Sequence, residues 1–416
     1  MLKKYFLNLY FFTFLLYLIF NKGIAYSFLV EFLWITGLIL IFISRKNFYF
    51  IINLKSKIII FFILLSNIYL LYGINKFPIL NVIKDSFVFN YACFTLILFL
   101  FIDEKELIWK KIKLIYNLYP FIPLLSFTVF NLIPSLDTIK IFGDITIMNH
   151  KHSDMAIHLL ISTIFLLRYN NEKKTNAQYY FILLIIFDFL IIASYSRSGT
   201  VSFIVGLLCY LYFNKERVIT SSFKQILKSI VVGFIIILPI YASIQIQENF
   251  QGRTVGFDQL KNNFLSIVSS NDDVPATLED NKIWRLVWWG KIINYSFTPQ
   301  YFFTGRGLGM SLVKTDGIDA NEDLRSPHNF HLTIMARFGV LVFFLWLYFL
   351  YQLFYEFFRR ELTGNRFLIA SILIAFVINA SFDVFLEGPM GAFPFWTFIG
   401  LLLIEEYYYN PKEIPN

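Results

Sequence analysis

The sequence is poor in charged residues. Asp, Glu, Lys and Arg make up 15% of the 416 residues, whereas ordinary globular domains contain about 25%. Apolar residues make up 57%, and apolar runs recur from one end of the chain to the other. These proportions exclude an ordinary soluble protein and predict an all-α integral membrane protein.

Other features that are rare or absent in the sequence limit the kinds of functional site that the protein can contain. The two cysteines, Cys93 and Cys209, lie inside apolar runs, where a small buried thiol is the usual explanation. No HExxH, paired-cysteine or aspartate-rich spacing is present, so a metal site has no positive support in the sequence. The Lys and Arg residues behind the net charge of +8 lie in short loops, which argues against a nucleic-acid partner. No internal repeat is visible, which weakens a secondary-transporter interpretation.

The apolar runs predict about twelve spanning helices, because a span needs about 20 apolar residues. Enrichment of Lys and Arg in alternate short loops places both termini in the cytoplasm. We expect spans one to nine in residues 1–244, a periplasmic loop with the catalytic motifs at 245–331, and spans ten to twelve in 332–416. The expected spans are 5–20, 28–43, 58–73, 86–102, 114–133, 154–169, 179–195, 199–213, 226–244, 332–354, 367–382 and 391–405.

The end of the polar loop, residues 326–331, reads Ser-Pro-His-Asn-Phe-His. Ser326 before Pro327 is typical of a helix start. His328 would then lie in the first turn, with His331 one turn further on the same side. The helix dipole would keep His328 neutral and able to accept a proton. The alternative is a loop histidine that helps to cap a helix.

Two arginines border apolar segments. Arg197 stands between two spans with almost no loop, where a guanidinium suits bidentate contacts with phosphate; contact with lipid headgroups is the alternative. Arg285 lies in a nearly apolar stretch, over Trp288 and Trp289 at helical spacing. Interfacial tryptophans explain the apolar part, but a buried arginine requires an anionic partner, either a carboxylate of the protein or a phosphate of a ligand.

A glycine-rich segment follows at residues 305–309. Gly305, Arg306, Gly307 and Gly309 allow close approach of the backbone to another group, although a plain glycine turn is the simpler interpretation. No Rossmann context surrounds the segment, so it predicts no dinucleotide site.

In this order, these stretches resemble the O-antigen ligase and polysaccharide polymerase superfamily. The matching stretches are Ser-Arg-Ser-Gly at 196–199, Arg285 followed by Trp288, the glycine segment at 305–309, and Pro-His-Asn-Phe-His-Leu at 327–332 followed by Gly339. Phe382-Asp383 and Pro389 also look like the family. The resemblance extends over residues 140–400, and the first half of the chain agrees in hydropathy only.

The resemblance implies transfer of a glycan from an undecaprenyl-diphosphate carrier to a sugar hydroxyl, at the periplasmic face of the bacterial inner membrane. It implies inversion at the anomeric centre without a metal or cofactor. His328 would be the base, although His331 leaves that assignment open, and Arg197 and Arg285 would stabilise the diphosphate. The predicted substrate-binding residues are Gly305, Arg306, Gly307, Gly309, Asn329, His331, Arg337 and Asp383.

Three acceptors are compatible with the resemblance. A polymerase uses another lipid-linked repeat unit, a ligase uses lipid A-core, and a protein-directed enzyme uses Ser or Thr. The absence of an extra acceptor-binding domain in the sequence favours the polymerase. The implied partners are the lipid-linked oligosaccharide, its glycan or lipid A-core acceptor, the lipid bilayer, a chain-length regulator and a flippase.

Two other classes compete with an enzyme. A flippase for lipid-linked oligosaccharide would also need many spans and a basic outer chamber, but not a long loop with a histidine and arginines. A scaffolding membrane protein leaves those same residues unexplained.

Overall fold

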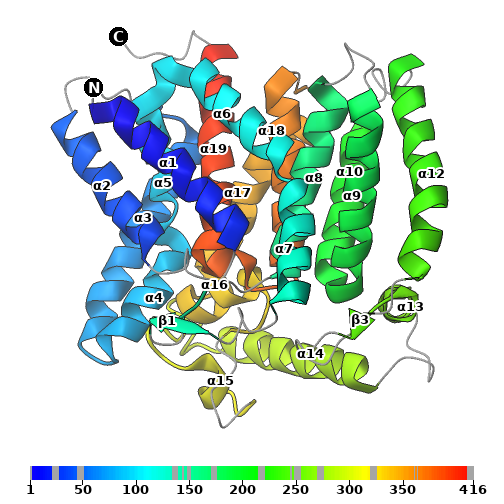
Figure 1. The fold of residues 1–416 in the computed structure, drawn as a ribbon. Coiled ribbons are helices and arrows are strands. Elements are labelled where there is room, and N and C mark those ends of the chain that lie inside the picture. Colours follow the sequence, from blue (N-terminus) through cyan, green and yellow to red (C-terminus); the bar gives the residue numbers. More distant parts are fainter. Residues whose placement is uncertain are drawn as a thin grey trace. The chain divides into compact units, whose positions relative to one another are not determined.

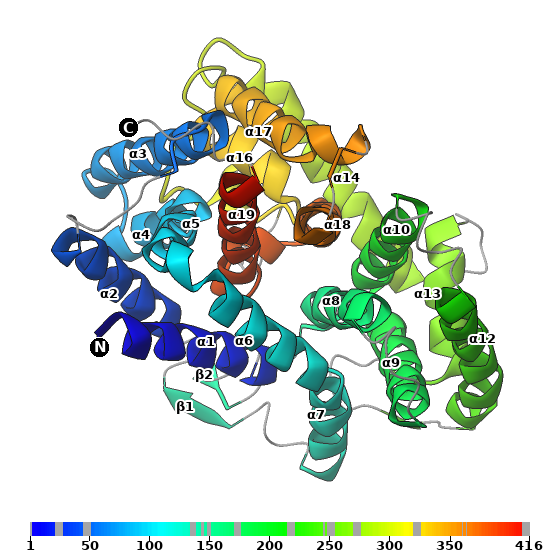
Figure 2. The ribbon, with the colours of Figure 1, turned by 90° about the horizontal axis from the view of Figure 1, so that it is seen from above.

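The computed structural model describes residues 2–20, 28–44, 51–133, 139–142, 145–147, 151–169, 176–213, 221–243, 246–247, 254–268, 276–318, 326–359, 361–362 and 364–409. These residues form mostly helices, seen in two directions in Figures 1 and 2. The chain divides into two compact units. Unit 1 is Met1–Leu33 with Asp103–Pro275, and unit 2 is Trp34–Ile102 with Ala276–Asn416.

Unit 1 contains eight of the described helices and two small antiparallel strand pairs. Its helices α8 and α10 touch closely, because a Cβ atom added at Gly199 would lie 2.9 Å from the Cα atom of Ser153. The helices are α1 (Leu2–Phe20), α6 (Lys105–Leu118), α7 (Phe121–Leu132), α8 (His152–Tyr169), α9 (Asn176–Tyr195), α10 (Arg197–Phe213), α12 (Ser221–Ala242) and α13 (Phe257–Val268). The strand pairs are β1 (Lys140–Phe142) with β2 (Ile145–Thr146), and β3 (Ile246–Gln247) with β4 (Thr254–Val255).

Unit 2 is built around α19 and α17. The hydroxyl of Thr95 donates a hydrogen bond of 2.9 Å to the carbonyl of Trp396, which joins α5 to α19. Most of α2 (Leu29–Ile43) belongs to this unit. Its other elements are α3 (Leu54–Ile74), α4 (Ile79–Asn90), α5 (Cys93–Leu98), η3 (Phe99–Glu104), α14 (Ala276–Ser296), α15 (Leu312–Thr315), α16 (Phe330–Phe338), α17 (Val340–Phe358), α18 (Gly364–Ala380), η6 (Phe385–Glu387) and α19 (Pro389–Tyr409).

Three of the described helices, α1, α3 and α17, are long and apolar enough to cross a membrane. The pair formed by α4 and the run Cys93–Leu118 passes the same test together but is bent by 52°, which gives up to four spans. Shorter apolar helices accompany them, among them α2 and α18. The helical membrane architecture predicted from the sequence is therefore confirmed, while the number of twelve spans stays a prediction.

Three predicted spans are interrupted in the structure. The span expected at 86–102 is divided between α4, which ends at Asn90, and α5, which begins at Cys93. The span expected at 114–133 is divided between α6 and α7, with Pro120 at the junction because proline has no N–H to continue the ladder. The span expected at 332–354 is divided between α16 and α17 at Gly339, whose φ of 89° is incompatible with a helix. Apolar composition alone does not reveal any of these breaks.

Candidate active site

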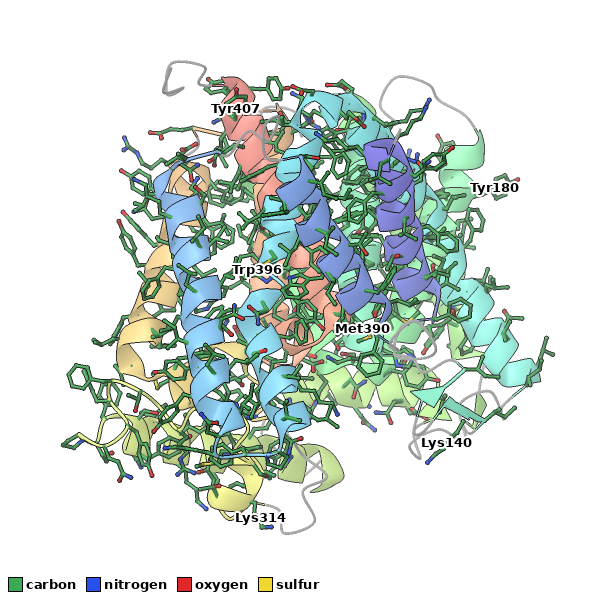
Figure 3. All side chains as sticks on the ribbon, turned by 90° about the vertical axis from the view of Figure 1, so that its left-hand side faces the viewer. Lys140, Tyr180, Lys314, Met390, Trp396 and Tyr407 are labelled. Carbon is green, nitrogen blue, oxygen red and sulfur yellow. The ribbon has the colours of Figure 1, made fainter. Side chains whose placement is uncertain are left out.

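The helices α14, α15 and α16 lie at one end of unit 2. Figure 3 labels Met390 near one end of α19 and Tyr407 near the other, with Lys314 of α15 beyond the Met390 end. A buried apolar cluster holds these helices together: Trp288, Ile292, Leu312, Val313, Leu332, Met335, Ala336 and Val340.

His328 does not lie in a helix, so the predicted helix start at Ser326 and Pro327 is wrong. The α16 helix starts at Phe330, and Asn329 is its N-cap, with its side chain accepting a hydrogen bond of 3.1 Å from the N–H of Leu332. His328 has a φ of 53°, a left-handed conformation that is uncommon for residues other than glycine. Such strain often marks functional positions.

The surroundings of His328 hold it at this position. Its ring meets the ring of Trp284 edge to face, with 5.6 Å between centroids. Immediately before it, the Pro327 carbonyl accepts a hydrogen bond of 2.7 Å from Trp289 Nε1. The imidazole is half-buried.

Arg285 contacts the same tryptophan as His328. Its guanidinium lies 5.4 Å from the centre of the Trp284 ring, while the predicted placement over Trp288 and Trp289 stays a prediction. Its Nη1 donates a hydrogen bond of 3.2 Å to the carbonyl of Phe382. The next residue, Asp383, is buried, and its Oδ1 accepts a hydrogen bond of 2.7 Å from the N–H of Val384. The structure thus brings His328, Arg285 and the Phe382-Asp383 segment into one region through Trp284.

His331 is held inside the protein by both ring nitrogens. Trp346 Nε1 donates a hydrogen bond of 2.9 Å to Nδ1, so Nδ1 carries no proton. Nε2 lies 3.1 Å from Ser381 Oγ and 3.4 Å from the Val377 carbonyl, which can only accept, so Nε2 carries the proton. Burial lowers the pKa of His331, and the Val377 carbonyl opposes this only in part. His331 is thus a neutral residue with neither nitrogen available as a base.

The glycine segment packs against the end of α16. The N–H groups of Arg306 and Gly307 donate hydrogen bonds of 2.8 and 3.0 Å to the carbonyls of Ala336 and Arg337. A Cβ atom added at Gly305 would lie 2.6 Å from the carbonyl carbon of Arg337. The close approach that Gly305 permits is therefore to the protein's own backbone.

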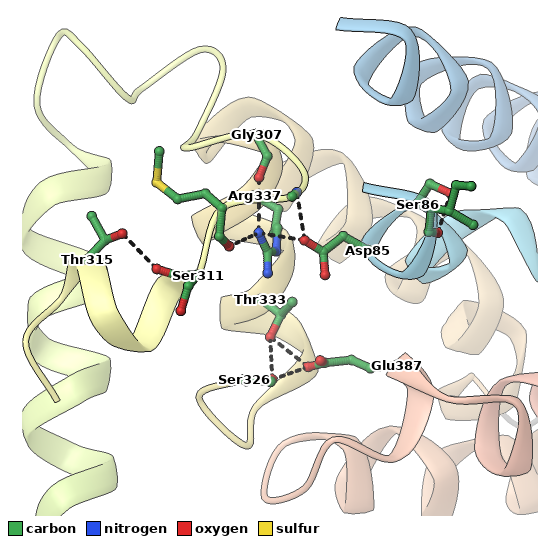
Figure 4. Close-up of polar contacts among 12 residues, drawn as sticks. Asp85, Ser86, Gly307, Ser311, Thr315, Ser326, Thr333, Arg337 and Glu387 are labelled. Atoms are coloured by element: carbon green, nitrogen blue, oxygen red, sulfur yellow. Dashed lines mark hydrogen bonds and ion pairs between the residues drawn. The ribbon is translucent and has the colours of Figure 1, made fainter. Parts of the chain in front are cut away.

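Arg337 ties this segment to α4, as Figure 4 shows. It is buried, forms an ion pair of 2.9 Å with Asp85 Oδ2, and donates to the carbonyls of Gly307 and Met310 at 3.3 and 2.8 Å. Asp85 Oδ2 also accepts a hydrogen bond of 2.8 Å from the N–H of Gly309. These contacts give Arg337 and Gly309 a structural role.

The Arg306 side chain also forms contacts within unit 2. It forms an ion pair of 2.6 Å with Asp316 Oδ1, and its guanidinium lies 3.9 Å from the centre of the Tyr295 ring. Asp316 Oδ2 accepts a hydrogen bond of 2.6 Å from Trp288 Nε1. Burial raises the pKa of Asp316, and the Trp288 and Arg306 contacts oppose that shift.

Glu387 joins the loop before His328 to α16. Its Oε1 accepts hydrogen bonds of 2.5 Å from Ser326 Oγ and 2.7 Å from Thr333 Oγ1 (Figure 4). The Ser326 hydroxyl, expected to cap a helix, is therefore used by Glu387. The pairings of Glu387 with Ser326 and of Asp85 with Arg337 could not be predicted from the sequence, because the partners lie far apart along the chain.

Arg197 belongs to unit 1. It is the first residue of α10, and its Nη1 donates a hydrogen bond of 3.3 Å to Ser266 Oγ of α13. Its predicted contact with phosphate stays a prediction.

The described residues contain no group of three or more His, Cys, Asp or Glu side chains placed to hold a metal ion. The independence from metals stays a prediction that needs a measurement on the enzyme.

The segment from α9 to the first part of α17 is similar to a known protein family. Residues 180–347 match the O-antigen ligase family. The match covers less than half of the chain, includes Arg197, Arg285, the glycine segment and His328, and confirms the resemblance to the O-antigen ligase and polymerase superfamily. No curated protein matches the chain. The O-antigen ligase match indicates an enzyme of the ligase or polymerase type that acts on a lipid-linked glycan and an acceptor.

Proposed function

We propose that the chain is a membrane glycosyltransferase that polymerises a surface polysaccharide, with His328 as its general base. The observation that carries the base assignment is the position of His328. It stands in a strained loop, and its ring lies against Trp284, which the guanidinium of Arg285 also contacts.

The proposed reaction is a single displacement. His328 accepts the proton of an acceptor sugar hydroxyl while the hydroxyl oxygen forms a bond to the anomeric carbon of the donor. The bond between that carbon and the diphosphate oxygen breaks, and undecaprenyl diphosphate leaves with the electron pair. Attack opposite the leaving group inverts the anomeric centre. General-base catalysis of this kind contributes about 100-fold to 10,000-fold in rate.

Arg285 is proposed to stabilise the charge that develops on the leaving diphosphate. Its guanidinium is fixed by the Trp284 ring and the Phe382 carbonyl, so little reorganisation is needed when charge appears on the phosphate oxygens. Its contact with the same tryptophan as His328 supports a common site.

The polymerase is proposed because both of its substrates have the same chemistry, a glycan on a lipid diphosphate. Nearly all described residues belong to two helical units, and these residues include no separate folded domain for another acceptor. Ligation to lipid A-core is the alternative outcome of the same chemistry.

The test is a transfer assay with purified protein in lipid vesicles. The donor is a synthetic undecaprenyl-diphosphate-linked repeat unit, supplied alone or together with lipid A-core. We expect the donor alone to yield polymer. Product only when lipid A-core is present would make the chain a ligase, and no transfer to either acceptor would reject the proposal.

A further inference from the structure

The α14 helix has two different faces in unit 2. One face is packed in the protein and carries Trp288 and Ile292, with Arg285 beside them. The other face carries an apolar stripe, which Phe297 extends just beyond the helix end. The side chains of the stripe are between 42% and 54% exposed: Ile283, Leu286, Val287, Ile293 and Phe297. Their spacing of three, one, six and four residues keeps them on one side of the helix.

The apolar stripe continues into the exposed surface of a membrane span. Phe297 packs against Phe302 with ring centroids 6.2 Å apart, and Phe302 against the exposed Phe303 at 5.1 Å. The Phe302 carbonyl then accepts a hydrogen bond of 2.8 Å from the N–H of Val340, the first residue of α17. The apolar stripe of α14 therefore adjoins the start of a helix that is long and apolar enough to span the bilayer.

That face of α17 is itself apolar and exposed. Its exposed residues include Leu341, Phe344 and Leu347, as expected for side chains that face lipid tails. Within unit 2, α14 runs across the direction of α17 and α18 (Figure 1), so a bilayer spanned by α17 would have α14 along its surface.

We propose that the apolar stripe of α14 docks onto the lipid bilayer, with its side chains among the upper parts of the acyl chains. The exposed Lys291, beside the stripe, would then lie at headgroup level, as is usual for a helix that lies in the interface. Arg285, on the opposite face, would stand close to the depth at which a lipid diphosphate lies. This last consequence rests on the proposed function.

The test uses single cysteines in protein reconstituted in lipid vesicles, with Cys93 and Cys209 first replaced by serine. Leu286→Cys and Val287→Cys sample the stripe, and Thr315→Cys on the exposed side of α15 is the matched control. We expect a membrane-impermeant maleimide to label Thr315→Cys at least about tenfold faster, because burial in lipid excludes the charged reagent. An environment-sensitive fluorophore at Val287→Cys should be quenched by lipids brominated in the upper acyl chain.

Two results would overturn the proposal. Equal labelling of Val287→Cys and Thr315→Cys would mean that the stripe faces water. Protection of Val287→Cys without quenching by brominated lipid would mean that another protein, such as a second copy of the chain, covers the stripe. Neither readout depends on glycosyl transfer, so failure of this proposal and failure of the proposed function are distinguishable.

Discussion

At the scale of single residues, two histidines three positions apart have different environments. His331 exchanges hydrogen bonds with Trp346 and Ser381, and His328 stands outside the helix with a positive φ. Sequence spacing alone left the base assignment open between them. Trp346 and Ser381 lie 15 and 50 residues beyond His331, so its structural role cannot be predicted from the local motif.

The proposed role of Arg285 depends on the planar shape of its guanidinium group, and this can be tested. Arg285→Lys should lower the transfer rate at least about tenfold, nearly as much as Arg285→Ala, because an ammonium cannot form the paired hydrogen bonds of a guanidinium. The measurement is initial polymerisation rate in vesicles. Arg359→Lys is the control, since the Arg359 side chain is 57% exposed. Full activity of Arg285→Lys would mean that only the charge matters.

The buried carboxyl group of Glu387 should make the stability of the protein depend on pH. Burial raises the pKa of Glu387, although hydrogen bonds from Ser326 and Thr333 oppose the shift. The folded state therefore binds the proton more tightly than the unfolded state, and stability should fall as pH rises from the ordinary Glu pKa of about 4.3 up to the folded-state value. Glu387→Gln keeps an oxygen acceptor for both hydroxyls and removes the titration.

The measurement is the thermal unfolding midpoint in detergent at a series of pH values. The midpoint of Glu387→Gln should rise relative to that of the wild type as the pH increases through this window. A constant difference between the two midpoints would show that Glu387 does not titrate with folding.

At the scale of elements, the break between α16 and α17 depends on Gly339. A Cβ atom there would lie 2.7 Å from the Phe302 carbonyl oxygen, and the backbone has a φ of 89° and a ψ of 177°. Gly339→Ala should destabilise the protein by about 1–3 kcal/mol from backbone strain alone. The thermal unfolding midpoint measures this effect.

Gly290 is the matched control. It lies inside α14, and a Cβ atom there would meet nothing within 4 Å. Gly290→Ala should leave the midpoint unchanged or raise stability by up to about 1 kcal/mol. Equal midpoints for both variants would mean that the break at Gly339 tolerates a side chain.

The elements also show how far the sequence predicts this fold. Apolar runs locate α1 and α3 well, because each is a single long apolar helix. They do not locate the divisions at Pro120 and Gly339, because the residues on both sides of each division are equally apolar. The pairing of Asp85 with the glycine segment, 224 residues away at Gly309, is also beyond sequence reasoning.

At the scale of the whole molecule, the O-antigen ligase match and the apolar helices indicate a membrane enzyme. The proposed chemistry uses an imidazole and guanidinium groups and assigns no step to a metal ion. EDTA should therefore leave the polymerisation rate of the vesicle-bound enzyme unchanged. Strong inhibition by EDTA that added Mg²⁺ or Mn²⁺ reverses would contradict a metal-independent mechanism.

The central claim is that His328, and not His331, is the catalytic base. The most direct measurement is electrophoresis of surface glycans from a strain that lacks the protein, complemented with wild type, His328→Gln or His331→Gln. An amide at position 331 offers one acceptor and one donor, as the neutral imidazole does toward Trp346 and Ser381. We expect His331→Gln to restore long polymer and His328→Gln to leave single repeats on lipid A-core, with both variants present in the membrane at wild-type level. Normal polymer with His328→Gln, or its loss with His331→Gln alone, would contradict the assignment.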